Sequence, residues 1–252
     1  MIADEHWPPP PEDWTTCDAD LHVWLVELEQ PEEIIQRLTQ FLAGDELARG
    51  QRFRFERDRR HFIVARGVLR SILSRYLKMT PAQVQFGYGL RGKPSLAAAC
   101  GDWQLRFNVS HSHELALYAV TYDRELGVDI EFMRPLDDAE SIATHFFSAG
   151  EQAALRGLPA HLKHQGFFNC WTRKEAYIKA TGEGLYQPLD EFDVSLTPGE
   201  PAQLLSVQGK SDEVQRWSLR ALQPPAGYAA ALAIEGTGWQ LSCWKWVEAI
   251  AR

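Results

Sequence analysis

The chain has 252 residues, of which 45% are hydrophobic, and its formal net charge at pH 7 is −8. This size and composition predict a globular core, as one large domain or two smaller halves. The acidic balance argues against a nucleic-acid-binding protein, and apolar runs such as 228–234 are far shorter than the roughly 20 residues that span a bilayer. Four scattered cysteines and no secretory signal pattern predict a cytoplasmic protein.

The first part of the chain is predicted to be a proline-rich arm over residues 1–16. Leu21–Leu28 then has the branched and aromatic composition of a β-strand. Helical periodicity predicts helices over 32–42 and 58–77.

An arginine-rich segment, residues 49–60, lies before and within the second predicted helix. It holds six arginines: Arg49, Arg52, Arg54, Arg57, Arg59 and Arg60. A solvated helix face is one interpretation, and a surface for an anion or an acidic partner is the other.

After these helices the hydrophobic period changes to that of strands. Four strands are predicted over 84–88, 103–109, 115–122 and 127–132. The last two are close in sequence, across Asp123-Arg124-Glu125, so we expect them to form a hairpin. The second half repeats the pattern, with helices over 149–156 and 164–181 and strands over 192–196, 217–222, 228–234 and 239–247.

Two segments resemble each other across the halves. WQLRFNVSHSHELALYAV (103–120) and WSLRALQPPAGYAAALAI (217–234) align without a gap. Chance similarity of two amphipathic strand pairs is one explanation, and a duplicated α+β unit about a pseudo-twofold axis is the other. The centres differ, SHSHE against PPAGY, which suggests that only the first turn takes part in chemistry.

The strand GVDIEF (127–132) carries two acids within an apolar pattern. Strand alternation places Asp129 and Glu131 on one face and Val128 and Ile130 on the other. The acids are compatible with an exposed strand face, or with a shared Mg²⁺, which prefers oxygen ligands.

A predicted helix supplies a third acid. Trp171, Glu175 and Lys179 are spaced i, i+4 and i+8, so they share one helix face. A solvated Glu–Lys pair is one interpretation. The other is a third carboxylate for the metal together with a cation for phosphate.

Two loops carry groups that suit phosphate oxygens. One contains Arg91 and Lys93, and the other is the turn after Asn108, with Ser110 and His111. The match of residues 87–92 to G-x-G-x-x-G is rejected because Pro94 follows and no helix begins there.

Taken together, these motifs closely resemble those of the 4′-phosphopantetheinyl transferases of the surfactin-synthetase (Sfp) type. The motifs are RGKP (91–94), FNVSHS (107–112), GVDIE (127–131) and WTRKEAYIKATGEGL (171–185), with RFRFERDRRHFIVARGVLR (52–70) and HFFSAGEQ (145–152) as further similar segments. The resemblance runs from about Leu21 to Val247.

The resemblance implies an α+β fold of two similar α/β subdomains related by a pseudo-twofold axis, in a monomer. The expected parts are the arm, an N-terminal half over 17–124 and a C-terminal half over 125–252 with the magnesium carboxylates. Coenzyme A would lie in the cleft between the halves.

The implied activity is that of a holo-[acyl-carrier-protein] synthase type transferase. Such enzymes move 4′-phosphopantetheine from coenzyme A, the co-substrate, to a serine of an apo carrier protein and release adenosine 3′,5′-bisphosphate. The expected partner is an acidic helical carrier domain of fatty-acid, polyketide or nonribosomal-peptide synthesis, with no nucleic acid and no membrane. A non-catalytic carrier-binding relative and a metal-dependent phosphodiesterase are the alternatives.

The resemblance also implies site roles. Asp129, Glu131 and Glu175 would bind Mg²⁺, Glu175 would act as base, and Lys179 would contact the pyrophosphate, so that Glu175, Asp129 and Lys179 form the catalytic set. The expected coenzyme A-binding residues are Arg49, Arg91, Lys93, Ser110, His111 and Lys179. Glu151 matches a family glutamate for which catalysis and helix capping are both open.

Overall fold

The computed structural model describes residues 7–12, 21–89, 92–101, 104–136, 138–184 and 187–248. Arg91 and most of the N-terminal arm therefore lie outside the described residues. The helices are α1 (Glu32–Thr39), α2 (Gly44–Gly50), α3 (Glu56–Tyr76), α4 (Ala139–Phe146), α5 (Ala149–Gly157), α6 (Ala160–Thr181) and α7 (Glu213–Arg216). The strands are β1 (Leu21–Glu27), β2 (Phe86–Tyr88), β3 (Pro94–Leu96), β4 (Leu105–Ser112), β5 (Leu115–Tyr122), β6 (Leu126–Phe132), β7 (Phe192–Val194), β8 (Leu204–Val207), β9 (Trp217–Leu222), β10 (Tyr228–Glu235) and β11 (Leu241–Lys245).

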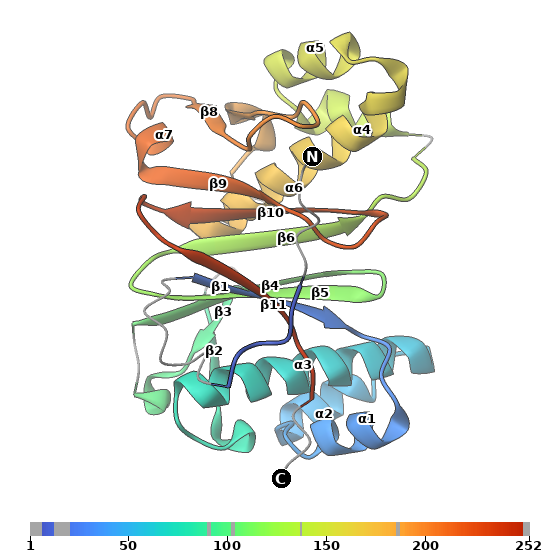
Figure 1. The fold of residues 1–252 in the computed structure, drawn as a ribbon, viewed down its shortest axis with the longest axis vertical. Helices are drawn as coiled ribbons and strands as arrows, with labels where there is room; N and C mark the ends of the chain where they lie inside the picture. Colours follow the sequence, from blue (N-terminus) through green and yellow to red (C-terminus); the bar gives the residue numbers. More distant parts are fainter. Residues whose placement is uncertain are drawn as a thin grey trace.

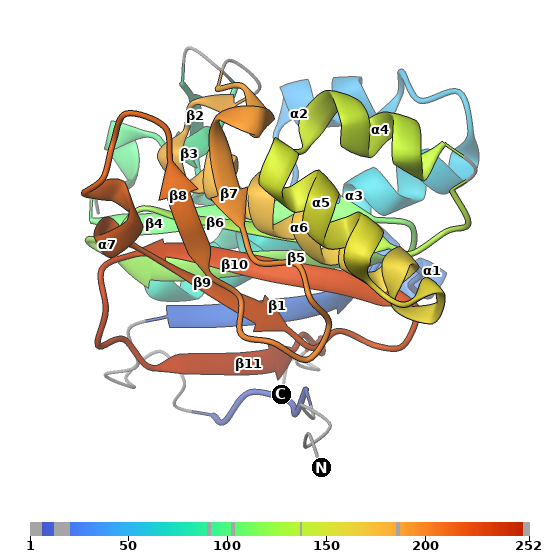
Figure 2. The ribbon, with the colours of Figure 1, turned by 90° about the horizontal axis from the view of Figure 1, so that it is seen from above.

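These elements form layers in which two sheets lie between two groups of helices (Figure 1). Helices α1–α3 cover the outer face of one sheet, and α4–α6 lie beyond the other, with α6 next to the strands (Figures 1 and 2). The mixed α+β class is thereby confirmed. No helix in the described ranges is long and apolar enough to cross a membrane.

The first sheet has the order β11-β1-β5-β4. Strand β1 is buried on both faces because it is central and covered on each side. Trp24 and Val26 pack with the apolar stripe of α3, while Leu21, Val23 and Leu25 face the second sheet. This arrangement explains why the segment reads as a continuous apolar run rather than as an alternating one.

The second sheet has the order β6-β10-β9 and lies against α6. Gly127 permits close contact between β6 and α6, since a Cβ atom there would come within 2.1 Å of the Ala176 carbonyl oxygen. The small Ala231 and Ala233 of β10 pack in the same core. Small side chains on the sheet thus bring the backbone of β6 close to the helix that carries Glu175.

The two sheets pack face to face through a shared apolar core. Val128 and Ile130 of β6 join Leu21 and Val23 of β1 in it, and Trp7 of the arm packs at its margin. Trp7 also donates from Nε1 to the Gln223 carbonyl at 2.7 Å. Part of the predicted arm is therefore bound to the body of the molecule.

Each half contains the same order of elements. The chain runs β1, α3, β4, β5 in one and β6, α6, β9, β10 in the other, and the sheet orders are β1-β5-β4 and β6-β10-β9. The gap-free alignment would place Leu222 opposite Ala233, as Asn108 lies opposite Ala119, but Ala233 pairs with Leu219. The pseudo-twofold axis and the monomeric state stay predictions.

One prediction about connectivity is wrong, and one strand of the expected C-terminal half pairs with the first sheet. Strands β5 and β6 form no hairpin, because β5 already pairs with β1 and β4 along its two edges. The chain turns at Asp123, with φ 55°, and enters the other sheet. The strand predicted over 239–247, assigned with the C-terminal half, is β11 and pairs in parallel with β1 of the first sheet. Its aromatic and apolar side chains complete that sheet's core.

Candidate active site

The three predicted acids lie where β6 meets α6. Asp129 and Glu131 project from β6 on the face toward the helix, and Glu175 and Lys179 come from α6. Asp129 is 3% exposed, whereas Glu131 and Glu175 are partly exposed. The strand is therefore not a solvated face, and the helix brings its charged stripe to it as the spacing predicts.

Asp129 is bound by two neighbouring groups. Its Oδ1 atom accepts hydrogen bonds from Lys179 Nζ at 2.6 Å and from Ser110 Oγ at 2.8 Å. Lys179 Nζ also donates to Ser110 Oγ at 3.0 Å. Burial raises the pKa of Asp129, and the ammonium of Lys179 opposes this effect. The group is thus a buried carboxylate whose charge depends on a nearby cation.

The other two acids repel Asp129 and each other. Burial first, and then the charge of Asp129, raise the pKa of Glu175 to about 7. Burial also raises the pKa of Glu131, while the Ser112 hydroxyl opposes it. Carboxylates that raise each other's pKa values lie near enough for their charges to interact, and a cation placed among them would lower that repulsion.

The chemistry of this cluster fits a hard cation. The Oδ2 atom of Asp129 is buried and has no hydrogen-bond partner among the residues that the structure describes, so this oxygen has a free ligating position. As the side chains stand in the described part of the chain, no three acids, histidines or cysteines are grouped closely enough to hold a metal ion. Lys179, bound to the other oxygen of Asp129, is the cation now in the cluster.

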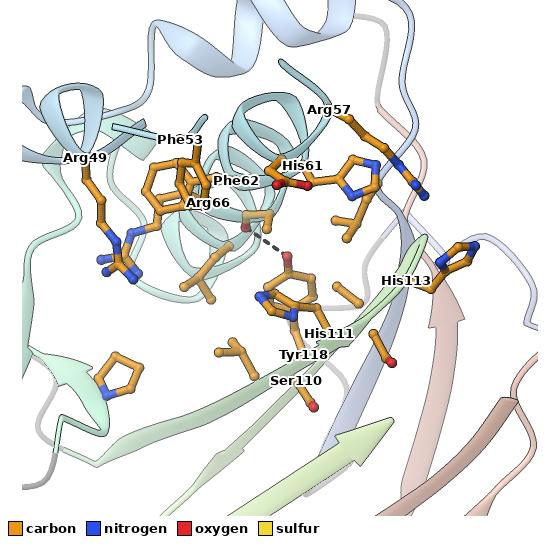
Figure 3. Close-up of a pocket in the computed structure, with 18 of the residues that line it drawn as sticks. Arg49, Phe53, Arg57, His61, Phe62, Arg66, Ser110, His111, His113 and Tyr118 are labelled. Atoms are coloured by element: carbon orange, nitrogen blue, oxygen red, sulfur yellow. Dashed lines mark hydrogen bonds between the residues drawn. The ribbon is translucent and has the colours of Figure 1, made fainter. Parts of the chain in front are cut away.

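A cavity of about 630 Å³ lies between α3 and β4 (Figure 3). Seven residues of α3 line it at alternating spacings of one and three, namely Arg57, Asp58, His61, Phe62, Ala65, Arg66 and Leu69. From β4 come Val109, Ser110, His111 and Ser112. Ser110, which lines the cavity, also contacts Asp129, so one residue of the cavity wall touches the acid cluster.

Several predicted phosphate-binding residues occupy different positions. Arg49 and His111 line the cavity and make no ion pair with any described residue. Ser110 has its hydroxyl on Asp129 and Lys179, on the side of β4 opposite to His111 (Figure 3). Lys93 Nζ lies 3.3 Å from Glu125 Oε2 and from the Ala180 carbonyl, so it joins the two halves instead of pointing into the cavity.

The sequence analysis named Arg57 within the arginine-rich segment but gave no role to His61 or Arg66 of α3. Arg57, His61 and Arg66 line the cavity, and the i, i+4 spacing of Arg57 and His61 was the available signal. Arg66 is fixed by Glu46, which is buried between Arg66 and Arg70. Glu46 therefore has a structural role: it orients Arg66, a basic residue of the cavity.

A second cavity of about 320 Å³ adjoins the first and shares Ser112 and His113 with it. Glu131 lies at its wall. The remaining lining is mostly apolar and comprises Phe132, Arg134, Leu136, Ile142, Phe167, Phe168 and Trp171. The acid cluster therefore lies between a basic cavity and an apolar one.

Glu151, for which two roles were open, caps a helix and forms a buried ion pair. It completes a capping box with Ser148 at the start of α5 and accepts from Val194 N at 2.8 Å. Its Oε2 atom lies 2.8 Å from Lys174 Nζ, and both side chains are at most 2% exposed. Lys174 also donates to the Phe192 carbonyl at 2.6 Å. These contacts support the structural role and hold α6 in place.

Comparison with known proteins gives one consistent result. A family model described as "4′-phosphopantetheinyl transferase superfamily" matches residues 125–233, and one described as "4′-phosphopantetheinyl transferase, N-terminal" matches residues 27–122. The 4′-phosphopantetheinyl transferase HetI of Nostoc sp. is 45% identical over 95% of this chain and 98% of its own length. The transferase psf-1 of Bacillus pumilus is 34% identical, over 68% of this chain and 70% of its own. Sfp of Bacillus subtilis is 27% identical, over 70% and 77%.

Proposed function

The chain belongs to the 4′-phosphopantetheinyl transferase superfamily, and we propose that it transfers the 4′-phosphopantetheine group of coenzyme A to a serine of a carrier protein. The Sfp-type subgroup agrees with the relatives from Bacillus named above. The products would be the modified carrier and adenosine 3′,5′-bisphosphate. The chain is thus an enzyme rather than a non-catalytic relative, and it retains all three acids and Lys179.

One observation carries the proposal. Ser110 and Ser112 line the basic cavity and also hydrogen-bond Asp129 and Glu131, so a bound anion and the acid cluster share a wall. A pyrophosphate placed along this wall would lie beside the carboxylates, and a metal ion held by them would neutralise part of its charge. This arrangement suits phosphoryl transfer, in which positioning and charge stabilisation do most of the work.

Asp129, Glu131 and Glu175 would hold Mg²⁺, which when bound neutralises charge that develops on the phosphate oxygens. Glu175 is our candidate base, because its pKa of about 7 lets it accept a proton from a serine hydroxyl near neutral pH. Lys179 is near enough to the cluster to bind a pyrophosphate oxygen. Arg49 and His111 are the cavity groups best placed for the other phosphate.

We place the carrier protein at the apolar cavity. The stretch from Gln152 to Lys174 contains no Asp or Glu. Its basic side chains Arg156, His161, Lys163 and His164 are exposed or partly exposed, and in the sequence they come shortly before the cavity residues of α6. An acidic helix with an apolar side chain beside its serine would complement such a surface. The arginine-rich segment is less suited, since Arg57, Arg59 and Arg60 are already paired with acids.

The activity is tested by incubating the protein with coenzyme A, Mg²⁺ and several apo carriers and measuring carrier mass. We expect a gain of one phosphopantetheine group. Asp129→Ala is expected to abolish the gain, because an oxygen ligand of the metal is lost, while Asp190→Ala, which changes an exposed acid, keeps it. If no carrier gains mass, or if Asp129→Ala remains fully active, the proposed function or the metal role is wrong.

The docking surface is tested by charge reversal. Lys163→Glu is expected to raise the KM for the carrier at least severalfold with little change in the KM for coenzyme A, because it repels an acidic helix. Arg59→Glu is the matched control on the arginine-rich segment. A larger effect of the control on the carrier KM would move the docking site to that segment.

Hydrolysis of a phosphodiester without transfer in the same assay would favour the phosphodiesterase alternative. The described cysteines Cys100, Cys170 and Cys243 are free thiols, in keeping with the expected cytoplasmic setting. The same assay with apo carriers of fatty-acid, polyketide and nonribosomal-peptide synthesis would identify the pathway of the carrier.

A further inference from the structure

Strands β4 and β6 belong to different sheets but are joined by the side chains of β4. The backbone N–H groups of Val128, Ile130 and Phe132 donate to Asn108 Oδ1 at 3.0 Å, Ser110 Oγ at 3.4 Å and Ser112 Oγ at 3.0 Å, respectively. Each pair is separated by 20 residues, so the two strands run in parallel with a constant offset. The side chains of β4 thus take the place of a neighbouring strand along the free edge of β6.

Ser112 makes a second contact from this position. Its hydroxyl accepts from Phe132 N and donates to Glu131 Oε2 at 2.7 Å. A serine hydroxyl has a single proton to donate, so acceptance from the strand leaves that proton for the carboxylate. The backbone of β6 therefore helps to orient the hydroxyl that holds the Glu131 side chain.

We propose that Ser112 is a positioning residue that fixes the Glu131 carboxylate for cation binding. The inference rests on the proposed function, in which Glu131 is one of the three acids that hold Mg²⁺. It assigns a role to Ser112, the last residue of β4, whereas the phosphate role was expected of Ser110 and His111, which precede it in the same strand and not in a turn.

The surroundings of Glu131 explain why such a group is needed. Glu131 lies at the wall of the apolar cavity, and its side chain is only partly buried. Its described hydrogen bond is the one from Ser112. Without that bond the flexible side chain could turn away from Asp129, because like charge between the two acids favours their separation. A neutral hydroxyl from the opposite sheet holds it in place.

Asn108 provides a matched control in the same row of side chains. It accepts from Val128 N at 3.0 Å, as Ser112 accepts from Phe132 N, but it makes no described contact with an acid. Its loss removes one link between the sheets and leaves the carboxylates untouched. Ser110 is unsuitable as a control because it contacts both Asp129 and Lys179.

The test measures binding of Mg²⁺ alone to the full chain by calorimetry, together with the melting temperature of each variant. We expect Ser112→Ala to weaken Mg²⁺ binding at least tenfold, the range found when a residue that orients a metal ligand is lost. Asn108→Ala is expected to lower the melting temperature without a comparable change in Mg²⁺ affinity. In transfer assays, added Mg²⁺ should restore the rate of Ser112→Ala.

Two further variants keep the test valid if Ser112→Ala does not fold. Ser112→Thr retains the hydroxyl and is expected to bind Mg²⁺ like the unaltered protein, while Ser112→Val has the same shape without the hydroxyl and is expected to bind it weakly. Equal Mg²⁺ affinity of the Thr and Val variants, or of Ser112→Ala and Asn108→Ala, would overturn the proposal. Weaker Mg²⁺ binding by Ser112→Val without carrier modification by the unaltered protein would uphold the positioning role and refute the proposed transfer.

Discussion

Lys179 is the only cation whose amine contacts Asp129 within the described residues. If Asp129, Glu131 and Glu175 are all ionised, this lysine balances one of three negative charges. Burial makes this excess of negative charge unfavourable, and the pKa values of all three acids are therefore raised. A proton on Glu175 is one way to reduce the excess, and a divalent cation is another. The two are therefore expected to compete.

We predict that the affinity for Mg²⁺ increases as pH rises from 6 to 8. Below its pKa of about 7, Glu175 holds a proton that must leave before the carboxylate can bind a metal. The gain is at most about tenfold per pH unit below that pKa, since one proton is released. Calorimetry with Mg²⁺ at pH 6, 7 and 8 measures it. Glu175→Gln is the control, and an equally steep dependence in that variant would assign the proton to another group.

The positions of the acids could be predicted from the sequence, because strand alternation and helix spacing are local rules. Asp129 and Glu131 share a face of β6, and Glu175 and Lys179 share a face of α6, as predicted. The hydrogen-bond partners of these acids could not be predicted. No local pattern states which face of β4 meets β6, so the contact of Ser110 with Asp129 could not be foreseen.

At the scale of elements, the packing of β6 on α6 sets the distance between the acids. Gly127 lies under the helix, and an added Cβ would be 2.1 Å from the Ala176 carbonyl oxygen and 2.4 Å from the Ala180 nitrogen. Both atoms belong to the helix backbone, so no side-chain rotation can relieve the contact. The sequence motif contains this glycine, but its reason becomes visible only when the helix is in place.

We predict that Gly127→Ala lowers the free energy of unfolding by about 1–3 kcal/mol, the usual cost of overpacking a core. The helix must move outward and carry Glu175 away from Asp129, so transfer activity should fall further than stability alone explains. Urea unfolding and carrier modification at a temperature where the variant is folded measure the two effects.

Gly157→Ala is the matched control for that substitution, because a Cβ at this helical glycine meets nothing within 4 Å. Its effect on stability is expected to be within about 1 kcal/mol and favourable, as helix propensity predicts. Similar losses of activity in the two glycine variants would contradict the role of close packing.

The prediction of elements succeeded where a segment was long and periodic, and it failed where tertiary pairing decided the outcome. Strand β1 and helices α3 and α6 follow the sequence pattern within a few residues. The expected hairpin of β5 and β6 failed because the edges of β5 are taken by β1 and β4. Short linkers favour a hairpin only when both strands have a free edge.

At the scale of the whole molecule, the chain does not divide cleanly between its two sheets. After β10 it crosses back, and β11 pairs in parallel with β1 at the edge of the first sheet. Trp244 of β11 lies 5.0 Å from the Trp24 ring and 4.5 Å from the His22 ring, measured between centroids. The first sheet therefore requires residues from near both ends of the sequence.

Because β11 belongs to the first sheet, a substitution in β11 is expected to destabilise that sheet. Trp244→Ala removes a 6% exposed side chain from the core beneath the first sheet, and such losses typically cost about 3–5 kcal/mol. In hydrogen exchange, protection should fall in β1 and α3, which follow one another near the start of the chain, before it falls in β9 and β10. If β9 and β10 were instead the first to lose protection, local stability would follow the order of the sequence and not the pairing of the strands, which would contradict this prediction.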